Sequence, residues 1–150
     1  MNLALSETDL PVRLALERPL TDEEFMRFCA ANEPMRVERE PNGEIIVMSP
    51  TGTGGGRIES RVYLELGNWA LADGRGEALG PTTGFKLPDN SVRAADAAWM
   101  SSRRWNALDA EELKRFARTC PEFVILSHPT HVFFPPQTPQ RSYVVAGRPG

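Results

Sequence analysis

The chain has 150 residues, a hydrophobic share of 41%, a charged share of 25% and a formal net charge of −3 at pH 7. These values are typical of a single soluble globular domain with one core. No apolar run is long enough for a membrane helix, and the net charge argues against tight nonspecific binding to nucleic acid by bulk electrostatics.

Nothing in the sequence indicates secretion or a zinc site. The N-terminal stretch lacks a basic region followed by a long apolar core, so we expect a cytoplasmic protein. Cys29 and Cys120 are isolated, and His128 and His131 do not supply paired zinc-type spacing. Both cysteines are therefore expected to be reduced core residues.

The first helix is predicted by its start signal. Residues 1–19 show neither a helical nor a strand period and are expected to form an irregular arm. Residues 21–24 then have the pattern of a capping box, in which the Thr21 hydroxyl accepts a hydrogen bond from a first-turn amide and the Glu24 side chain bonds back to the Thr21 amide. The helix that follows has an apolar face and ends at residues 32–34. That face contains Phe25, Phe28 and Cys29.

A β-hairpin is predicted next. Residues 36–40 alternate polar and apolar, residues 41–43 are a Pro-Asn-Gly turn, and residues 44–48 are rich in β-branched side chains. Glu38 and Glu40 share one side of their strand, so at least one acid can approach the sheet face. The alternative is a solvated strand edge.

The glycine-rich stretch 49–56 resembles a phosphate-binding loop only superficially. It lacks the Gly-Lys-Ser/Thr ending of a P-loop and the glycine spacing of a dinucleotide fingerprint, so we expect a flexible connection. Residues 57–73 carry apolar side chains at helical spacing, and Gly74 is placed to end that helix.

One carboxylate stands out in the middle of the chain. After short strands at 77–80 and 83–87 and a turn at 88–91, residues 92–100 form an apolar run that contains Asp96. Burying a charged carboxylate is costly unless a metal or a donor compensates it. The alternative to a metal site is an Asp at a strand end, capped by backbone amides or by Arg93.

The predicted domain ends near residue 126. Residues 101–107 are expected to form a short helical turn, residues 109–112 a second capping box that opens a helix, and residues 121–126 a buried closing strand. The stretch 127–150 contains five prolines and is expected to be poorly ordered or loosely docked. The domain therefore spans residues 20–126, between the arm and this tail.

The predicted fold class is α/β (α+β), a mixed sheet flanked by helices. Six stretches together closely resemble the Uma-two family of restriction-endonuclease-like proteins, within the PD-(D/E)XK nuclease superfamily. The resemblance covers residues 20–125 and implies a restriction-endonuclease-like core. The stretches are LTDEEF (20–25), GEIIVMSPTG (43–52), TGFKLP (83–88), RAADAAW (93–99), WNAL (105–108) and CPEFVI (120–125).

This resemblance implies a metal site and a substrate. In the family pattern an Asp and a Glu on neighbouring strands hold Mg²⁺, a Lys shortly after the Glu orients water, and DNA is cleaved. Carboxylates suit this role because Mg²⁺ prefers hard oxygen ligands and can activate bound water. The pattern assigns Asp96 as the metal ligand and catalytic acid, with Glu38 as the additional catalytic acid from the hairpin.

The chain departs from the family pattern at its end. Ala95 replaces the usual proline before Asp96, and Leu126 stands where the metal-binding Glu is expected. Glu122 lies four residues earlier, roughly 13 Å away along a strand, and no lysine follows Lys114. Because the core also lacks the family's closing elements, we interpret it as truncated at its C-terminal end. A frameshift near the codon for Leu126 would explain all of these losses.

The family resemblance and the missing residues point to two different functions. One is a Mg²⁺-dependent DNA endonuclease, impaired by the missing Glu and Lys. The other is an inactive nuclease-fold remnant that binds nucleic acid or protein. A module that forms a homodimer through exposed edge strands is a third alternative.

Overall fold

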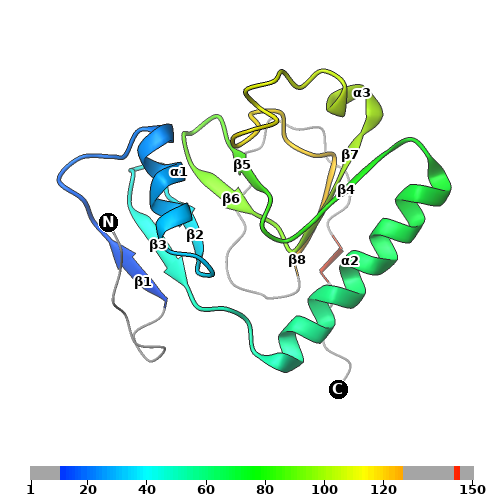
Figure 1. Cartoon of the computed structure of the whole chain (residues 1–150), viewed down its shortest axis with the longest axis horizontal. Coiled ribbons are helices and arrows are strands. Elements are labelled where there is room, and N and C mark those ends of the chain that lie inside the picture. The colour runs from blue at the N-terminus through cyan, green and yellow to red at the C-terminus, as the bar shows by residue number, and fades with distance from the viewer. Residues whose placement is uncertain (1–10, 127–143, 146–150) are drawn as a thin grey trace.

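In the computed structural model, residues 11–126 and 144–145 are described (Figure 1). Their strands form two sheets, in the orders β1-β3-β2-β6-β5 and β4-β7-β8-β9. The predicted α+β class is confirmed, with two sheets in place of one. The elements are β1 (Val12–Leu14), α1 (Asp22–Ala31), β2 (Arg36–Arg39), β3 (Ile45–Met48), α2 (Thr53–Asp73), β4 (Gly76–Leu79), β5 (Gly84–Lys86), β6 (Val92–Ala94), β7 (Ala97–Ser101), α3 (Ser102–Trp105), β8 (Phe123–Leu126) and β9 (Val144–Val145).

Helix α1 begins at the predicted capping box. The Glu24 amide donates to the Thr21 hydroxyl at 3.3 Å, and the Thr21 amide donates to the Glu24 carboxylate at 2.8 Å. The helix ends at Ala31, with Asn32 as its C-cap. Phe25 and Phe28 are buried against the first sheet, in a core cluster with Ile45, Val47 and Val92. The start, the end and the apolar face predicted for this helix are therefore confirmed.

Glu24 should make the stability of the protein depend on pH. The Arg18 guanidinium donates to both Glu24 carboxylate oxygens, and together with the Thr21 amide it lowers the Glu24 pKa from 4.5 to about 2. A carboxylate with a depressed pKa stabilises the fold above its unfolded pKa, and this contribution is lost as the pH falls through its folded pKa. We expect the unfolding free energy to decrease between pH 4.5 and about 2, and the decrease to be smaller in Glu24→Gln. Denaturant unfolding at several pH values measures both, and equal pH slopes would contradict the assignment.

The hairpin of β2 and β3 forms as predicted, with Arg36 opposite Met48 and Arg39 opposite Ile45. Its turn needs Gly43, which has a φ of +87° and lies so close to Pro19 that a Cβ would be 2.6 Å from the proline Cβ. Strand β1 pairs with the outer edge of β3. The prediction that this part of the arm is irregular is therefore wrong for residues 12–14, because the edge of β3 offers unpaired backbone groups. Residues 1–10 lie outside the described part of the chain.

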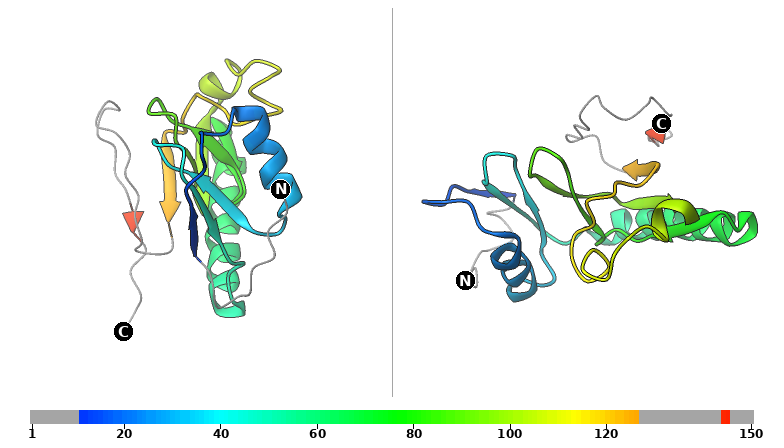
Figure 2. Two further views of the ribbon diagram at one scale, coloured as in Figure 1. Left: turned by 90° about the vertical axis from the view of Figure 1, so that its left-hand side faces the viewer. Right: turned by 90° about the horizontal axis from the view of Figure 1, so that it is seen from above.

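Helix α2 starts earlier than predicted. Gly52 is its N-cap, so residues 53–56 belong to the helix and the expectation of a flexible loop there is wrong. Gly74 ends the helix in the left-handed conformation, with a φ of +67°, as predicted. The helix runs along β4 and β7, and the rings of Trp69 and Trp99 meet edge to face at 5.5 Å. Figure 2 shows the two sheets side by side, the first with α1 and the second with α2.

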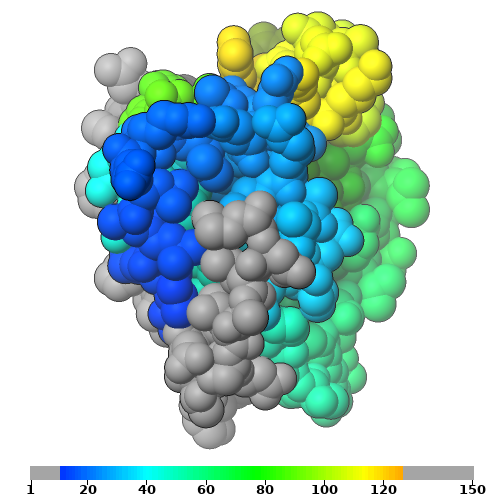
Figure 3. Space-filling model, turned by 60° about the vertical axis from the view of Figure 1, so that its left-hand side comes forward, coloured from blue at the N-terminus to red at the C-terminus, as the bar shows by residue number. Residues whose placement is uncertain are grey.

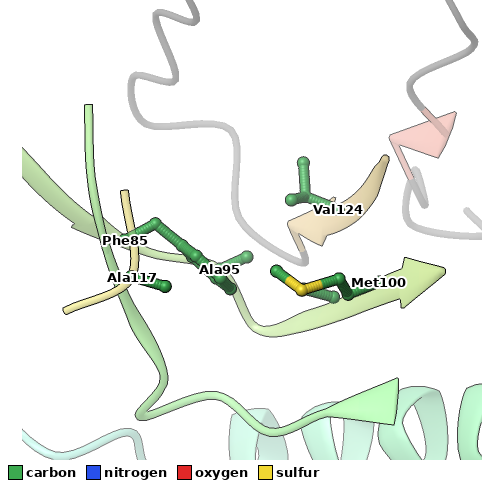
Figure 4. Packing of buried hydrophobic residues seen from close by; sticks show 6 residues of the cluster. Phe85, Ala95, Met100, Ala117 and Val124 are labelled. Atoms are coloured by element: carbon green, nitrogen blue, oxygen red, sulfur yellow. The ribbon is translucent and has the colours of Figure 1, made fainter. Parts of the chain in front are cut away.

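The apolar run at residues 92–100 is divided between the two sheets. Strand β6 belongs to the first sheet and β7 to the second, and Ala95 and Asp96 form the link between them. The prediction of one continuous strand is therefore wrong. The second core cluster surrounds this link (Figure 4). Its buried members are Phe85, Ala95, Ala98, Met100, Ala117 and Val124.

The second capping box forms without the predicted helix. The Asp109 carboxylate accepts from the amides of Glu111 and Glu112, both at 2.8 Å, but the chain makes only turns after it. Leu113 is 55% exposed, so it does not contribute to a buried helical face. Phe116 contacts Phe25 of α1, and Arg115 pairs with Glu23 at 3.0 Å. In Figure 3 the yellow surface of the later part of the chain borders the blue surface of the N-terminal part. These contacts draw the chain back to the core instead of extending a helix.

The short helix α3 and the closing strand β8 both form as predicted. Strand β9, from the proline-rich stretch, pairs in parallel with β8. The rest of the predicted tail lies outside the described residues. Within residues 11–126, no helix is long and apolar enough to cross a bilayer.

Candidate functional site

The two acids predicted from the sequence share one guanidinium group. Arg36 donates to Asp96 Oδ1 through Nη1 at 2.9 Å and to Glu38 Oε1 through Nη2 at 3.2 Å. Arg36 and Glu38 are two residues apart on β2, so their side chains point to the same side of the sheet. Nη2 also donates to the carbonyl of Ala94, at the end of β6. The site therefore lies where the first sheet joins the second.

Both acids are largely withdrawn from solvent. The Asp96 side chain is 7% exposed, that of Glu38 is 13% exposed and that of Arg36 is 32% exposed. The sequence left open whether Arg93 compensates Asp96, and the structure gives Arg36 as a partner of Asp96. Charged groups at this depth need such compensation, because desolvation of an unpaired carboxylate costs several kcal/mol.

The network continues along the hairpin. Arg93 bridges Glu38, at 3.3 Å, and Glu40. Arg13 of the first strand bridges Glu40, at 3.5 Å, and Glu44, at 3.0 Å. Acids and arginines thus alternate from Asp96 to Glu44. The prediction that Glu38 and Glu40 lie on one side of their strand is confirmed by their shared partner, whereas a solvated edge does not fit the burial of Glu38.

Sequence reasoning named Arg93 as a possible partner of Asp96 but missed Arg36 and Arg13. Arg36 lies two residues before Glu38 on β2, and Arg93 lies on β6, three residues before Asp96 in the link. Strand alternation could have placed Arg36 and Glu38 on one face. It could not have shown that Arg36 reaches Asp96, which is sixty positions later in the chain.

Strand β8 runs beside Asp96. Ile125 is opposite Ala97, and its carbonyl also accepts from the Asp96 amide at 3.1 Å. Asp96 and Ala97 therefore both pair with Ile125, as two residues pair with one at a β-bulge. Leu126 follows directly and packs against the cluster around Ala95. The position at which the family pattern expects a metal-binding Glu is thus next to Asp96, and it carries an apolar side chain.

Glu122 has a different role, near the opposite end of this strand pair. Its carboxylate accepts from the amide and hydroxyl of Ser101, at 2.9 and 2.6 Å, and pairs with Arg104 at 3.0 Å. Burial by itself would raise the Glu122 pKa, but the bonds from Ser101 and the charge of Arg104 outweigh it and lower the pKa. Glu122 therefore stabilises the junction of β7 and α3.

Comparison with protein families matches residues 22–125 to Uma2, which is described as "Putative restriction endonuclease". The chain belongs to the Uma2 family. No curated protein matches the chain at a significant level. The Uma2 match contains Glu38 and Asp96 and stops one residue before Leu126. The resemblance inferred from six short stretches is confirmed.

The residues of this Uma2 chain do not fit a magnesium ion as they stand. Within residues 11–126, no group of three or more His, Cys, Asp or Glu side chains lies close enough to hold a metal. The Asp96 and Glu38 carboxylates, which share Arg36 as a partner, are already bound by it. Mg²⁺ needs carboxylate oxygens that are free to face it. Asp96 and Glu38 therefore form a neutralised ion-pair network in this structure.

A second polar cluster lies on the other side of the hairpin, beside a cavity of about 290 Å³. Arg39, only 4% exposed, and Lys86 both pair with Asp22, at 2.9 and 2.6 Å. Burial tends to raise the Asp22 pKa, but the bonds from Lys86 and Arg39 outweigh it and lower the pKa. The cluster holds two cations and one carboxylate, and its contacts join α1, β2 and β5 in the Uma2 core.

Proposed function

We propose that this Uma2 chain is a restriction-endonuclease-type domain, directed at DNA phosphodiester bonds, whose Mg²⁺-dependent hydrolysis is impaired. The observation that carries the proposal is the residue that follows Ile125 on the strand paired beside Asp96. Strand β8 contacts Asp96 through Ile125, and the next residue is Leu126, where the family pattern has a second metal-binding carboxylate.

The chemistry explains why this substitution matters. Hydrolysis of a phosphodiester depends on positioned charge that stabilises the transition state, so a lost ligand and a lost cation each remove part of it. Asp96 and Glu38 would be the catalytic acids of the family-type reaction, with Asp96 on the metal. No lysine follows Lys114 in the sequence, and Lys86 is paired with Asp22 at the other cluster.

A plasmid-nicking assay tests the proposal. We expect wild-type protein and Asp96→Ala to give the same background conversion of supercoiled DNA in Mg²⁺ or Mn²⁺. Cleavage by the wild type that is lost in Asp96→Ala would contradict impairment and would show that Asp96 acts in catalysis. Arg13→Ala, which removes a partner of two other glutamates, is the matched control for changes in the ion-pair network.

The second candidate is a domain that binds DNA without cutting it. The pairing of Asp96, Glu38 and Glu40 with arginines favours it, because neutralised carboxylates repel phosphates less than free ones. Fluorescence anisotropy of a labelled duplex over a range of salt concentrations tests this candidate. Affinity that falls steeply with salt supports phosphate contacts, and absence of binding at low salt rejects it.

A further inference from the structure

We infer that Arg36 is the built-in cation of the Asp96–Glu38 pair and keeps these carboxylates from binding a divalent metal ion. Its guanidinium lies between the two carboxylates, with hydrogen bonds of 2.9 Å to Asp96 and 3.2 Å to Glu38. A diffusible ion that used the same oxygen atoms would have to displace Arg36 or bind beside its positive charge. Both are unfavourable where solvent is largely excluded.

The strand holds Arg36 in this position. Arg36 starts β2, which is paired on one side with β3 and on the other with β6. The same Nη2 that reaches Glu38 also donates to the Ala94 carbonyl, so the group is tied to the link between the sheets. A cation fixed by the chain loses no translational freedom on binding, whereas a metal ion from solution does.

The hydrogen bonds of Arg36 indicate that the carboxylates it contacts determine the orientation of its side chain. Its Nε is buried and has no hydrogen-bond partner among the described residues. An unsatisfied buried donor is costly, so this arrangement persists because the two Nη groups are well bound. Arg36 is therefore placed by Asp96, Glu38 and Ala94 together, and is not a surface arginine that happens to touch an acid.

This inference concerns ion binding and does not depend on DNA cleavage, so it can fail or hold separately from the proposed function. The test is titration of Mn²⁺ into the full chain by isothermal calorimetry, with thermal unfolding followed in parallel. We expect Arg36→Met to bind one Mn²⁺ per chain with an affinity at least about tenfold above that of the wild type. The same ion should raise the unfolding temperature of this variant only.

Two further variants locate the binding. Adding Asp96→Asn to Arg36→Met should abolish the gain, because it removes a carboxylate from the pair. Arg13→Met, which also removes an arginine that contacts two glutamates but whose side chain is 57% exposed, should leave Mn²⁺ binding at the wild-type level.

Equal Mn²⁺ affinity in the wild type and in folded Arg36→Met would overturn the inference, as would a gain that survives Asp96→Asn. If Arg36→Met does not fold, Arg36→Gln decides. Glutamine keeps a hydrogen-bond donor but removes the positive charge, so Mn²⁺ should bind this variant more tightly than the wild type. Binding equal to that of the wild type would then overturn the inference.

Discussion

Replacing Arg39 by methionine is expected to lower the free energy of unfolding by about 3 kcal/mol, because it removes one partner of a buried ion pair. The Arg39 side chain is 4% exposed and donates to Asp22 at 2.9 Å, to the Leu20 carbonyl at 3.2 Å and to the Asn90 carbonyl at 3.0 Å. Its guanidinium also lies 5.1 Å from the centre of the Phe25 ring. Methionine keeps the apolar stem but satisfies none of these acceptors. Denaturant unfolding measures the loss.

Arg13→Met provides the matched control for Arg39→Met. Arg13 also bonds two acids, but its side chain is 57% exposed. Exposed ion pairs contribute only about 0 to 1 kcal/mol. If both variants lost similar stability, the claim that burial makes Arg39 important would be wrong.

Replacing Leu126 by glutamate is expected to lower the free energy of unfolding by about 2 kcal/mol more than replacing it by glutamine, because glutamate brings a second carboxylate next to Asp96. Both variants lose the packing of Leu126 against the cluster around Ala95, and only the glutamate adds charge. Arg36 cannot neutralise three acids alone. The excess negative charge should therefore attract a divalent cation, in contrast to the wild-type pair.

The cation response separates this effect from simple loss of packing. Mn²⁺ at about a hundred times its dissociation constant should restore roughly 2.7 kcal/mol to Leu126→Glu, and nothing to Leu126→Gln. Thermal unfolding with and without Mn²⁺ measures the difference. Equal stability of the two variants, with no response to Mn²⁺, would show that the side chain at position 126 does not approach Asp96.

The parts of the fold predicted best from the sequence are those with short-range signals. The Thr21 capping box, the Gly43 turn and Gly74 at the end of α2 each depend on a few neighbouring residues, and each is confirmed. The box at Asp109 shows the limit of such signals. Its hydrogen bonds form, but the contact between Phe116 and Phe25 of α1 draws the chain away from a helix. A tertiary contact of this kind leaves no local pattern.

The candidate site was predicted only in part for the same reason. The sequence identified Asp96 as a buried acid and Glu38 as an acid able to approach the sheet. The sequence predicted one strand over residues 92–100, since this alanine-rich run contains no glycine or proline that would mark the change from one sheet to the other. The role of Arg36 depends on contact between residues sixty positions apart. No spacing rule predicts such a contact, so the neutralised state of the acids is visible only in three dimensions.

The Ala95–Asp96 link has a mechanical consequence. Strand β2, with Arg36 at its start, lies in one sheet, whereas Asp96 directly precedes the first residue of β7 in the other. A change in the angle between the sheets would alter the separation of this ion pair. By reciprocity, a ligand that separates Arg36 from Asp96 would shift the preferred angle between the sheets. The orientation of the two halves of the domain and the pairing of Asp96 with Arg36 are therefore coupled.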